Sequence, residues 1–240
     1  MSERYPEPAA DAPLVVFDFD HTLCDGDAGT ELYRWLIGRV WWRWLLALLV
    51  APVAGPMVAF LRTRKAGISA FVWAGSVGES QPLEALIDHY VATHEAKLRA
   101  SALPTALKVF AGHRRAGDRV VVATGAPPRL ARAILRLVAD DDLPVIGTEL
   151  AAGCGGLVVQ QHCHYKMKMT MLHAAGFTQP IARAYSDSSA DLPLLQAAAH
   201  PVVVNPKPSR VALFRRVLPP GTPILHWACP GRGGDPAPCS

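Results

Sequence analysis

Short apolar segments alternate with longer amphipathic segments over most of the chain. The apolar segments have strand length and no polar alternation, which is typical of strands buried on both faces of a parallel sheet. They lie at residues 14–20, 119–123, 144–146, 181–185 and 201–204. The segments between them predict helices at residues 104–116, 128–138, 166–175 and 191–199. The sequence therefore predicts an α/β fold with a doubly wound, Rossmann-like parallel sheet and a ligand site beyond the carboxyl ends of its strands.

Residues 25–102 interrupt this alternation. The stretch is mostly helical in character and lies between the first and second strands, so we expect a helical cap inserted after the first strand. The core then consists of residues 14–24 and 103–227, with flexible tails at residues 1–13 and 228–240. Three glycines within Gly153–Gln161 predict a hairpin arm that projects from the sheet.

The composition narrows the class of protein. The 240 residues are 50% hydrophobic and 18% charged, which excludes a disordered chain. A net charge of +4 does not by itself indicate a nucleic-acid-binding protein. The five cysteines form no C-x-x-C pair, so we expect a reducing compartment. The polar N-terminal segment predicts no cleaved signal peptide.

Polar residues gather where the predicted strands end. Asp18 and Asp20 follow the first strand, Thr124 and Gly125 follow the second, and Asp187 follows a later one. A carboxylate nucleophile needs a proton donor for its leaving group, and a second carboxylate supplies one. A divalent cation relieves the repulsion between such acids, while a threonine hydroxyl and a glycine amide suit phosphate oxygens. Each signal is modest alone, because acids also cap helices and glycines also form turns.

The order and spacing of these residues are more specific than any one of them. Asp-x-Asp-x-Thr after the first strand, Thr-Gly after a later strand, a lysine and then Asp-x-x-x-Asp resemble the haloacid dehalogenase superfamily of aspartate-nucleophile phosphatases, over residues 14–206. The Ser-Asp-x-x-x-Asp-Leu-Pro-Leu-Leu segment resembles the phosphoserine-phosphatase-like branch. The apolar cap segment, the Gly-Cys-Gly-Gly-Leu-Val-Val arm, the Cys163–Lys168 spacing and Tyr-Ser-Asp-Ser are similar to the bacterial phosphatidylglycerophosphatase C group.

The resemblance implies a role for each acid. Asp18 would attack phosphorus and form an aspartyl-phosphate, and Asp20 would protonate the leaving alkoxide and then activate the hydrolytic water. Asp18, Asp187 and the backbone carbonyl of Asp20 would bind Mg²⁺, and Asp191 would support the metal or the lysine. These roles imply a Mg²⁺-dependent phosphomonoesterase.

The resemblance also implies a phosphate site. Thr124, the Gly125 amide and Lys168 would hold the transferring phosphoryl group and offset its charge. Lys168 is preferred to Lys166 because the family places its lysine five residues after a cysteine that matches Cys163.

The chain departs from the family pattern at two positions. His21 and Ser186 stand where the family has glycine, and neither change removes a reacting atom. For His21 a turn-stabilising role is preferred to a contact with substrate phosphate. The His162-Cys163-His164 triplet hints at a metal site, but no second pair of ligands has the spacing of a zinc site.

Residues 44–61 carry no charge and form the most hydrophobic part of the chain. As a helix they would span about 27 Å, against a bilayer core of about 30 Å. A single crossing would put Asp18 and the later site residues on opposite sides of the membrane. We therefore expect a segment that enters and returns at Pro52–Pro56 or lies in the interface, in preference to a soluble cap core. Tryptophans with Arg39 and Arg43 at its leading edge suit an interface belt.

Three functions are weighed on this basis. The first is a Mg²⁺-dependent phosphatase that acts on phosphatidylglycerol phosphate at the cytoplasmic face of the inner membrane. The second is a phosphatase of the cytoplasm for a small metabolite such as phosphoserine. The third, a membrane-associated binding protein with an inactive core, is disfavoured because all the reacting residues are present.

Overall fold

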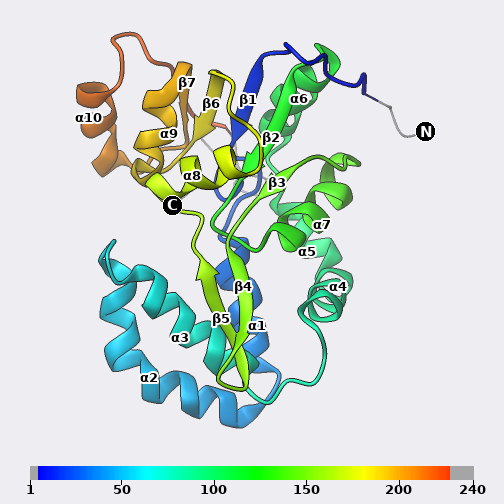
Figure 1. Ribbon diagram of the computed structural model, residues 1–240, viewed down its shortest axis with the longest axis vertical. Helices are drawn as coiled ribbons and strands as arrows, with labels where there is room; N and C mark the ends of the chain where they lie inside the picture. The colour runs from blue at the N-terminus through cyan, green and yellow to red at the C-terminus, as the bar shows by residue number, and fades with distance from the viewer. Residues whose placement is uncertain (1–4, 228–240) are drawn as a thin grey trace.

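The computed structural model describes residues 5–227, so the predicted C-terminal tail and residues 1–4 of the N-terminal tail lie outside the described residues. Its main element is a sheet of six strands, all parallel, in the order β3-β2-β1-β6-β7-β8 (Figure 1). The strands are β1 (Leu14–Phe17), β2 (Arg119–Ala123), β3 (Val145–Ile146), β6 (Ile181–Ser186), β7 (Ala198–Val204) and β8 (Ile224–Leu225). In the central strand, Val16 pairs with Val121 on one side and Ala184 on the other.

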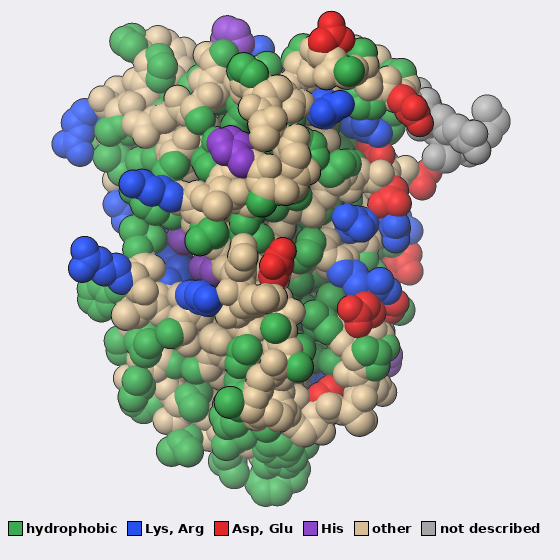
Figure 2. All heavy atoms as spheres, viewed as in Figure 1, with side chains coloured by type: hydrophobic (Ala, Val, Ile, Leu, Met, Phe, Trp, Pro, Cys, Tyr) green, Lys and Arg blue, Asp and Glu red, His purple; other side chains and the backbone are tan. Residues whose placement is uncertain are grey.

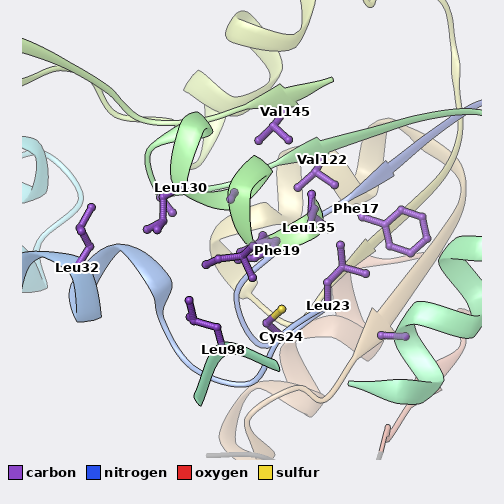
Figure 3. Packing of buried hydrophobic residues seen from close by; sticks show 14 of the residues in the cluster. Phe17, Phe19, Leu23, Cys24, Leu32, Leu98, Val122, Leu130, Leu135 and Val145 are labelled. Carbon is purple, nitrogen blue, oxygen red and sulfur yellow. The ribbon is translucent and has the colours of Figure 1, made fainter. Parts of the chain in front are cut away.

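Successive residues of β1 point to opposite faces of the sheet, and all of them are apolar. Both faces are therefore covered by helices. Val15 and Phe17 pack on the face that α6 (Pro104–Arg115) and α7 (Pro128–Ala139) cover. Leu14 and Val16 pack on the face covered by α8 (Lys166–Ala174), α9 (Leu192–Ala197) and α10 (Pro208–Val217). Figure 3 shows Phe17, Phe19 and Leu23 inside the first of these layers. The predicted doubly wound sheet is confirmed.

The helix predicted at residues 191–199 is wrong at both ends. A 3₁₀ turn occupies Ser189–Asp191, and α9 ends at Ala197. Strand β7 starts at Ala198, three residues earlier than predicted, because Ala198 pairs with Ile181 of β6. Alanine favours a helix locally, and strand pairing overrides that preference.

Of the six helices between β1 and β2, the first five form the cap (Figure 1). They are α1 (Ala28–Gly38), α2 (Trp41–Ala59), α3 (Arg64–Ser76), α4 (Leu83–Thr93) and α5 (Glu95–Ser101). Helix α3 packs closely along α2 at Gly67, where a Cβ atom would lie 2.7 Å from the carbonyl oxygen of Ala54. A cap inserted after the first strand is therefore confirmed.

The predicted hairpin arm is longer than expected and packs against the cap. It consists of β4 (Glu149–Gly153) and β5 (Gly156–Gln161), paired antiparallel. The amide of Leu157 donates to the Ser76 hydroxyl at 2.7 Å, and the amide of Val159 donates to the Ser69 hydroxyl at 3.0 Å. Both serines belong to α3, so the arm extends from the sheet and is hydrogen-bonded to the cap.

Helix α2 runs without a break through the segment where a turn was predicted. Pro52 and Pro56 are both exposed and lie inside the helix, and the chain turns only after Ala59. A proline removes one helical hydrogen bond and crowds the preceding turn. Neither cost ends α2, which continues to Ala59. The expectation that the segment returns at Pro52–Pro56 is therefore wrong.

The outer face of α2 is apolar and exposed. Trp41, Leu45, Leu48, Leu49 and Val53 are 56–76% exposed. Among the described residues, α2 is the one helix whose length and composition would allow it to cross a membrane, and 17% of its apolar window is buried. Figure 2 shows apolar side chains covering the end of the molecule that α2 forms. These side chains do not form a cap core, which was the soluble alternative for this segment.

The arginines expected in an interface belt have a different role. Arg43 is buried, and its Nη1 donates to Glu79 Oε2 at 3.2 Å while its Nη2 donates to the carbonyl of Val77. Arg39 pairs with the same carboxylate at 3.2 Å. Both guanidinium groups therefore tie the junction of α1 and α2 to the segment after α3. Arg43 is buried and so does not belong to an interface belt, whereas Arg39 is exposed, and its place in such a belt stays a prediction.

Candidate active site

The side chains of two aspartates that follow β1 point to the same edge of the sheet. The amide of Asp18 still donates to the carbonyl of Tyr185 in β6, at 2.9 Å, so this residue continues the strand. Its Oδ1 accepts the amide of Phe19 at 2.8 Å. Phe19 points into the hydrophobic core (Figure 3), and the chain then turns, which brings Asp20 to the site as well.

Asp20 joins three parts of the structure. Its Oδ1 accepts the amide of Ala28, the first residue of α1 in the cap, at 2.7 Å. Its Oδ2 accepts the hydroxyl of Thr124, after β2, at 3.2 Å. Burial, together with the carboxylates of Asp27 and Asp18, raises the pKa of Asp20 to about 8. A carboxyl group that holds its proton near neutral pH has the character of a general acid.

Lys168 is buried between two acids. Its Nζ donates to Asp18 Oδ1 at 3.0 Å and to Asp191 Oδ2 at 2.6 Å. Burial lowers the pKa of Lys168, but the charges of Asp18 and Asp191 outweigh it and hold the pKa above its ordinary value. Lys166 is exposed at the start of α8. Of the two roles open for Asp191, the structure shows the contact with the lysine.

Ser186 is a site residue that the sequence reasoning missed. Its hydroxyl lies 2.8 Å from Asp191 Oδ2 and 3.4 Å from Asp18 Oδ2, and it accepts the amide of Ser188. A serine at a position where the family has glycine therefore adds a hydroxyl that ties β6 to both acids. The departure from the pattern was the available signal, and it was interpreted only as a harmless change.

The phosphate loop follows β2. Thr124 is buried, its amide donates to the carbonyl of Ile146 in β3, and its hydroxyl accepts the amide of Ala126 at 3.0 Å. Gly125 comes next and is partly exposed. Strand pairing therefore fixes the loop beside Asp20, with the Gly125 amide at the edge of the site.

Fully ionised, the acids of the site would carry more negative charge than their protein partners balance. Lys168, which pairs with Asp18 and Asp191, is the one cation among residues 5–227 that is bonded to any of the four acids Asp18, Asp20, Asp187 and Asp191. Burial, followed by the charges of Asp18 and Asp191, raises the pKa of Asp187 to about 8. An arrangement of acids that hinder one another's ionisation suits a divalent cation with oxygen ligands.

The same geometry limits which atoms would hold such a cation. In the described part of the chain, no three histidine, cysteine, aspartate or glutamate side chains gather as a metal-binding group. The Asp20 carboxylate is engaged by Ala28 and Thr124. The donors that fit are therefore the carboxylates of Asp18 and Asp187 with the backbone carbonyl of Asp20, as the resemblance implies.

Comparison with known proteins gives the family. The model of the haloacid dehalogenase-like hydrolases matches residues 15–196. The chain belongs to this family. Protein CicA of Caulobacter vibrioides (strain NA1000 / CB15N) is 28% identical to this hydrolase over 194 residues, which cover 77% of the chain and 82% of CicA. The inhibition of morphological differentiation protein of Streptomyces azureus is 30% identical over 127 residues, which cover 50% of the chain and 44% of that protein.

Solved structures share the fold of this haloacid dehalogenase-like hydrolase. A protein with unknown function from Bordetella pertussis Tohama I matches with a TM-score of 0.60 and 22% identity, over 89% of this chain and 98% of that one. A phosphoserine phosphatase in its apo form matches with a TM-score of 0.54 and 16% identity, over 90% and 93%. The predicted superfamily and the phosphoserine-phosphatase-like fold are confirmed, and they support the predicted enzyme class, a phosphatase.

The second departure from the family pattern has a backbone explanation. His21 has a φ of +55°, in the left-handed region where glycine costs least. Its Nδ1 lies 3.5 Å from Asp25 Oδ1 and 3.4 Å from the amide of Gly26. Both contacts lie within the turn after β1, which agrees with the turn-stabilising role.

Proposed function

We propose that this hydrolase cleaves phosphomonoesters through an aspartyl-phosphate on Asp18. The observation that carries the proposal is the position of Asp18 and Asp20 at one strand end, with Lys168 bonded to the first and Thr124 to the second. Asp18 Oδ1 is engaged by Lys168 and by the amide of Phe19, whereas the one hydrogen bond of Oδ2 within residues 5–227 is the 3.4 Å contact with the serine hydroxyl of β6. Oδ2 is therefore the oxygen free to attack phosphorus.

The two carboxyl groups divide the reaction. Asp18 Oδ2 bonds to phosphorus as the ester P–O bond breaks, and the proton of Asp20 moves to the leaving alkoxide. Asp20, now ionised, takes a proton from the water that attacks the acyl phosphate, and inorganic phosphate leaves with Asp18 restored. Lys168 and the Gly125 amide hold the phosphoryl oxygens, joined by the Thr124 hydroxyl once its hydrogen turns from Asp20 to the substrate.

Mg²⁺ is the cation that this set of oxygen donors favours. Asp18, Asp187 and the backbone carbonyl of Asp20 would hold it. When bound, it offsets the negative charge of the phosphoryl group and of the acids around it. Chelation should abolish turnover, and added Mg²⁺ should restore it.

The substrate we propose is a lipid phosphomonoester, phosphatidylglycerol phosphate, at the cytoplasmic face of the inner membrane. Its support is the exposed apolar face of α2, which belongs to the cap that faces the catalytic site. With its other side packed on α3, α2 presents this apolar face outward, and such a face is buried when the helix lies in the membrane interface. This position keeps Asp18 and the later site residues on one side of the membrane, as a single crossing would not.

A small soluble substrate such as phosphoserine is the second candidate. What favours it is the likeness of the fold to phosphoserine phosphatases, at identities of 16% and below. The apolar face of α2 would then require a different partner, because it does not close the core of the cap.

The experiment measures phosphate release by the purified protein with Mg²⁺. Phosphatidylglycerol phosphate in mixed micelles is compared with phosphoserine, and each assay is repeated with Asp18→Asn and with chelator. We expect turnover of the lipid, at least a thousandfold loss in Asp18→Asn, and no activity without Mg²⁺. Preference for phosphoserine would refute the lipid substrate, and turnover by Asp18→Asn at the parent rate would refute the aspartyl-phosphate.

A further inference from the structure

A second group of nitrogen-bearing side chains lies where the cap meets the core. Arg64 is the first residue of α3, and His162 and His164 lie between β5 and α8. The two imidazole rings are stacked, with their centroids 5.2 Å apart. Figure 2 shows basic and histidine side chains together at the boundary between the sheet and the cap. None of the three has a role in the proposed reaction.

Arg64 is held in place but its charge is not balanced. Its Nε donates to the carbonyl of Val58 at 2.9 Å, and its Nη1 donates to His164 Nε2 at 2.8 Å. A guanidinium group has five N–H donors, so three remain for another partner. Arg43 and Arg114 pair with carboxylates, whereas no carboxylate within residues 5–227 pairs with Arg64.

The two histidines are neutral donors beside this charge. A guanidinium cannot accept a hydrogen bond, so His164 Nε2 is the acceptor and its proton lies on Nδ1. The Thr148 hydroxyl accepts the amide of Cys163 and lies 2.9 Å from His162 Nδ1; we assign the hydroxyl as the donor to Nδ1, which leaves an N–H at His162 Nε2. Burial lowers the pKa of both rings to about 4, and the charges of Arg64 and Lys168 act in the same direction.

The group lies next to the phosphate loop. His162 Cε1 is 4.0 Å from the position that a Cβ atom on Gly125 would take. From Gly125, a row of donors therefore leads through His162 and His164 to Arg64 on the cap. A substrate whose phosphomonoester occupies the loop would place the atoms attached to it along this row.

We infer that Arg64, His162 and His164 form a second anion site, which binds a phosphodiester group of the substrate while Asp18 attacks the phosphomonoester. The inference rests on the proposed function. The substrate class is a phosphomonoester joined through a short polyol to a phosphodiester. Phosphatidylglycerol phosphate and its deacylated headgroup both have this chemistry, and arginine binds a phosphate through two parallel hydrogen bonds.

The test compares substrates with and without the second anion. Glycerol 3-phosphate has the monoester alone, deacylated phosphatidylglycerol phosphate has both groups without acyl chains, and the intact lipid in micelles adds the chains. Arg64→Gln should raise the KM of the deacylated compound about tenfold relative to that of glycerol 3-phosphate, because a charge-assisted pair is lost. Arg62→Gln, an exposed arginine two residues away, should leave this ratio unchanged.

Two results with the soluble substrates would overturn the inference. One is an unchanged KM ratio in Arg64→Gln, whether neither KM moves or both rise equally, and the other is a fall in kcat alone, which would indicate a latch between cap and core. An effect confined to the intact lipid would likewise assign Arg64 to the membrane and not to the substrate. Unfolding midpoints of both variants show whether the fold is intact.

Direct binding separates this inference from the proposed function. Glycerophosphoglycerol carries the diester without a monoester, and its binding is measured by calorimetry on the intact protein. If the parent turns over none of the phosphomonoesters, the proposed function fails. The second anion site still stands if glycerophosphoglycerol binds and Arg64→Gln weakens that binding about tenfold. The inference of a second anion site is refuted if the parent does not bind glycerophosphoglycerol.

Discussion

The exposed face of α2 allows membrane attachment to be tested without disturbing the fold. Leu48 and Leu49 are 64% and 76% exposed, so they contribute little to folding. Burying a whole leucine side chain is worth about 1.5–3 kcal/mol. Inserting the exposed parts of these two into lipid is therefore worth about 2–4 kcal/mol together. The double variant Leu48→Gln/Leu49→Gln should lower the partition coefficient for membranes at least thirtyfold.

The assay is flotation with liposomes that contain anionic lipid, with the bound fraction measured across lipid concentrations. Leu225→Gln is the matched control, because Leu225 is 37% exposed in β8 of the core, away from the cap. We expect the control to partition like the parent. The double variant should keep the parent's unfolding midpoint, and both variants should keep the parent's turnover of a soluble phosphomonoester.

Two outcomes would refute this reasoning. If the double variant floats with the liposomes as the parent does, the apolar face of α2 does not attach the protein. If it instead unfolds at a clearly lower temperature, Leu48 and Leu49 have packing partners, and the helix belongs to a buried interface. A charged substitution at Leu46 would give a less clear answer, because Leu46 is partly buried against Ile37 and Ala74.

Three further predictions follow from single contacts. Lys168→Met should abolish phosphate release and lower the free energy of unfolding by about 3 kcal/mol, since two buried acids lose their cation. The control Lys166→Met, at an exposed lysine, should change neither the phosphate release nor the free energy of unfolding. His21→Gly should stay within about 1 kcal/mol of the parent in urea unfolding, and His21→Ile should lose about 1–2 kcal/mol more, because only glycine adopts its φ freely. Burial raises the pKa of Glu79, but hydrogen bonds from Gln81 and Arg43 and the charge of Arg39 outweigh this and hold the pKa below 4.5. The stability that Glu79 adds should therefore be complete above about pH 4.5 and lost as the pH falls below it, a loss that thermal melts of Glu79→Gln should not show.

Residues at the ends of strands were predictable from sequence because the parallel sheet itself brings them together. Asp18, Thr124 and Asp187 each follow an apolar run, and the carboxyl ends of parallel strands share one edge. No detail of packing was needed for that inference. Ser186 and Arg64 were missed because their importance comes from contacts with residues far away in sequence, which neither spacing nor composition encodes.

The apolar segment shows a different limit of sequence reasoning. Its hydrophobicity was evident, but not which of its residues face outward. Pro52 and Pro56 predicted a turn, whereas the helix continues through both residues. The arginines at its start predicted an interface belt, whereas Glu79, some 40 positions away from Arg39, takes both guanidinium groups. Charge pairing across the cap is a tertiary property.

The cap connects the exposed face of α2 to the catalytic site through packed contacts. Close packing at Gly67 fixes α3 on α2, and α3 begins with Arg64, which contacts His164 beside the phosphate loop. At its other contact the cap presents the amide of Ala28 to Asp20. Movement of the cap away from the core would break both contacts together, so the position of the proton donor and the second anion site depend on one closed arrangement. Substitutions on the outer face of α2 leave that arrangement intact, and for this reason they should separate membrane attachment from turnover.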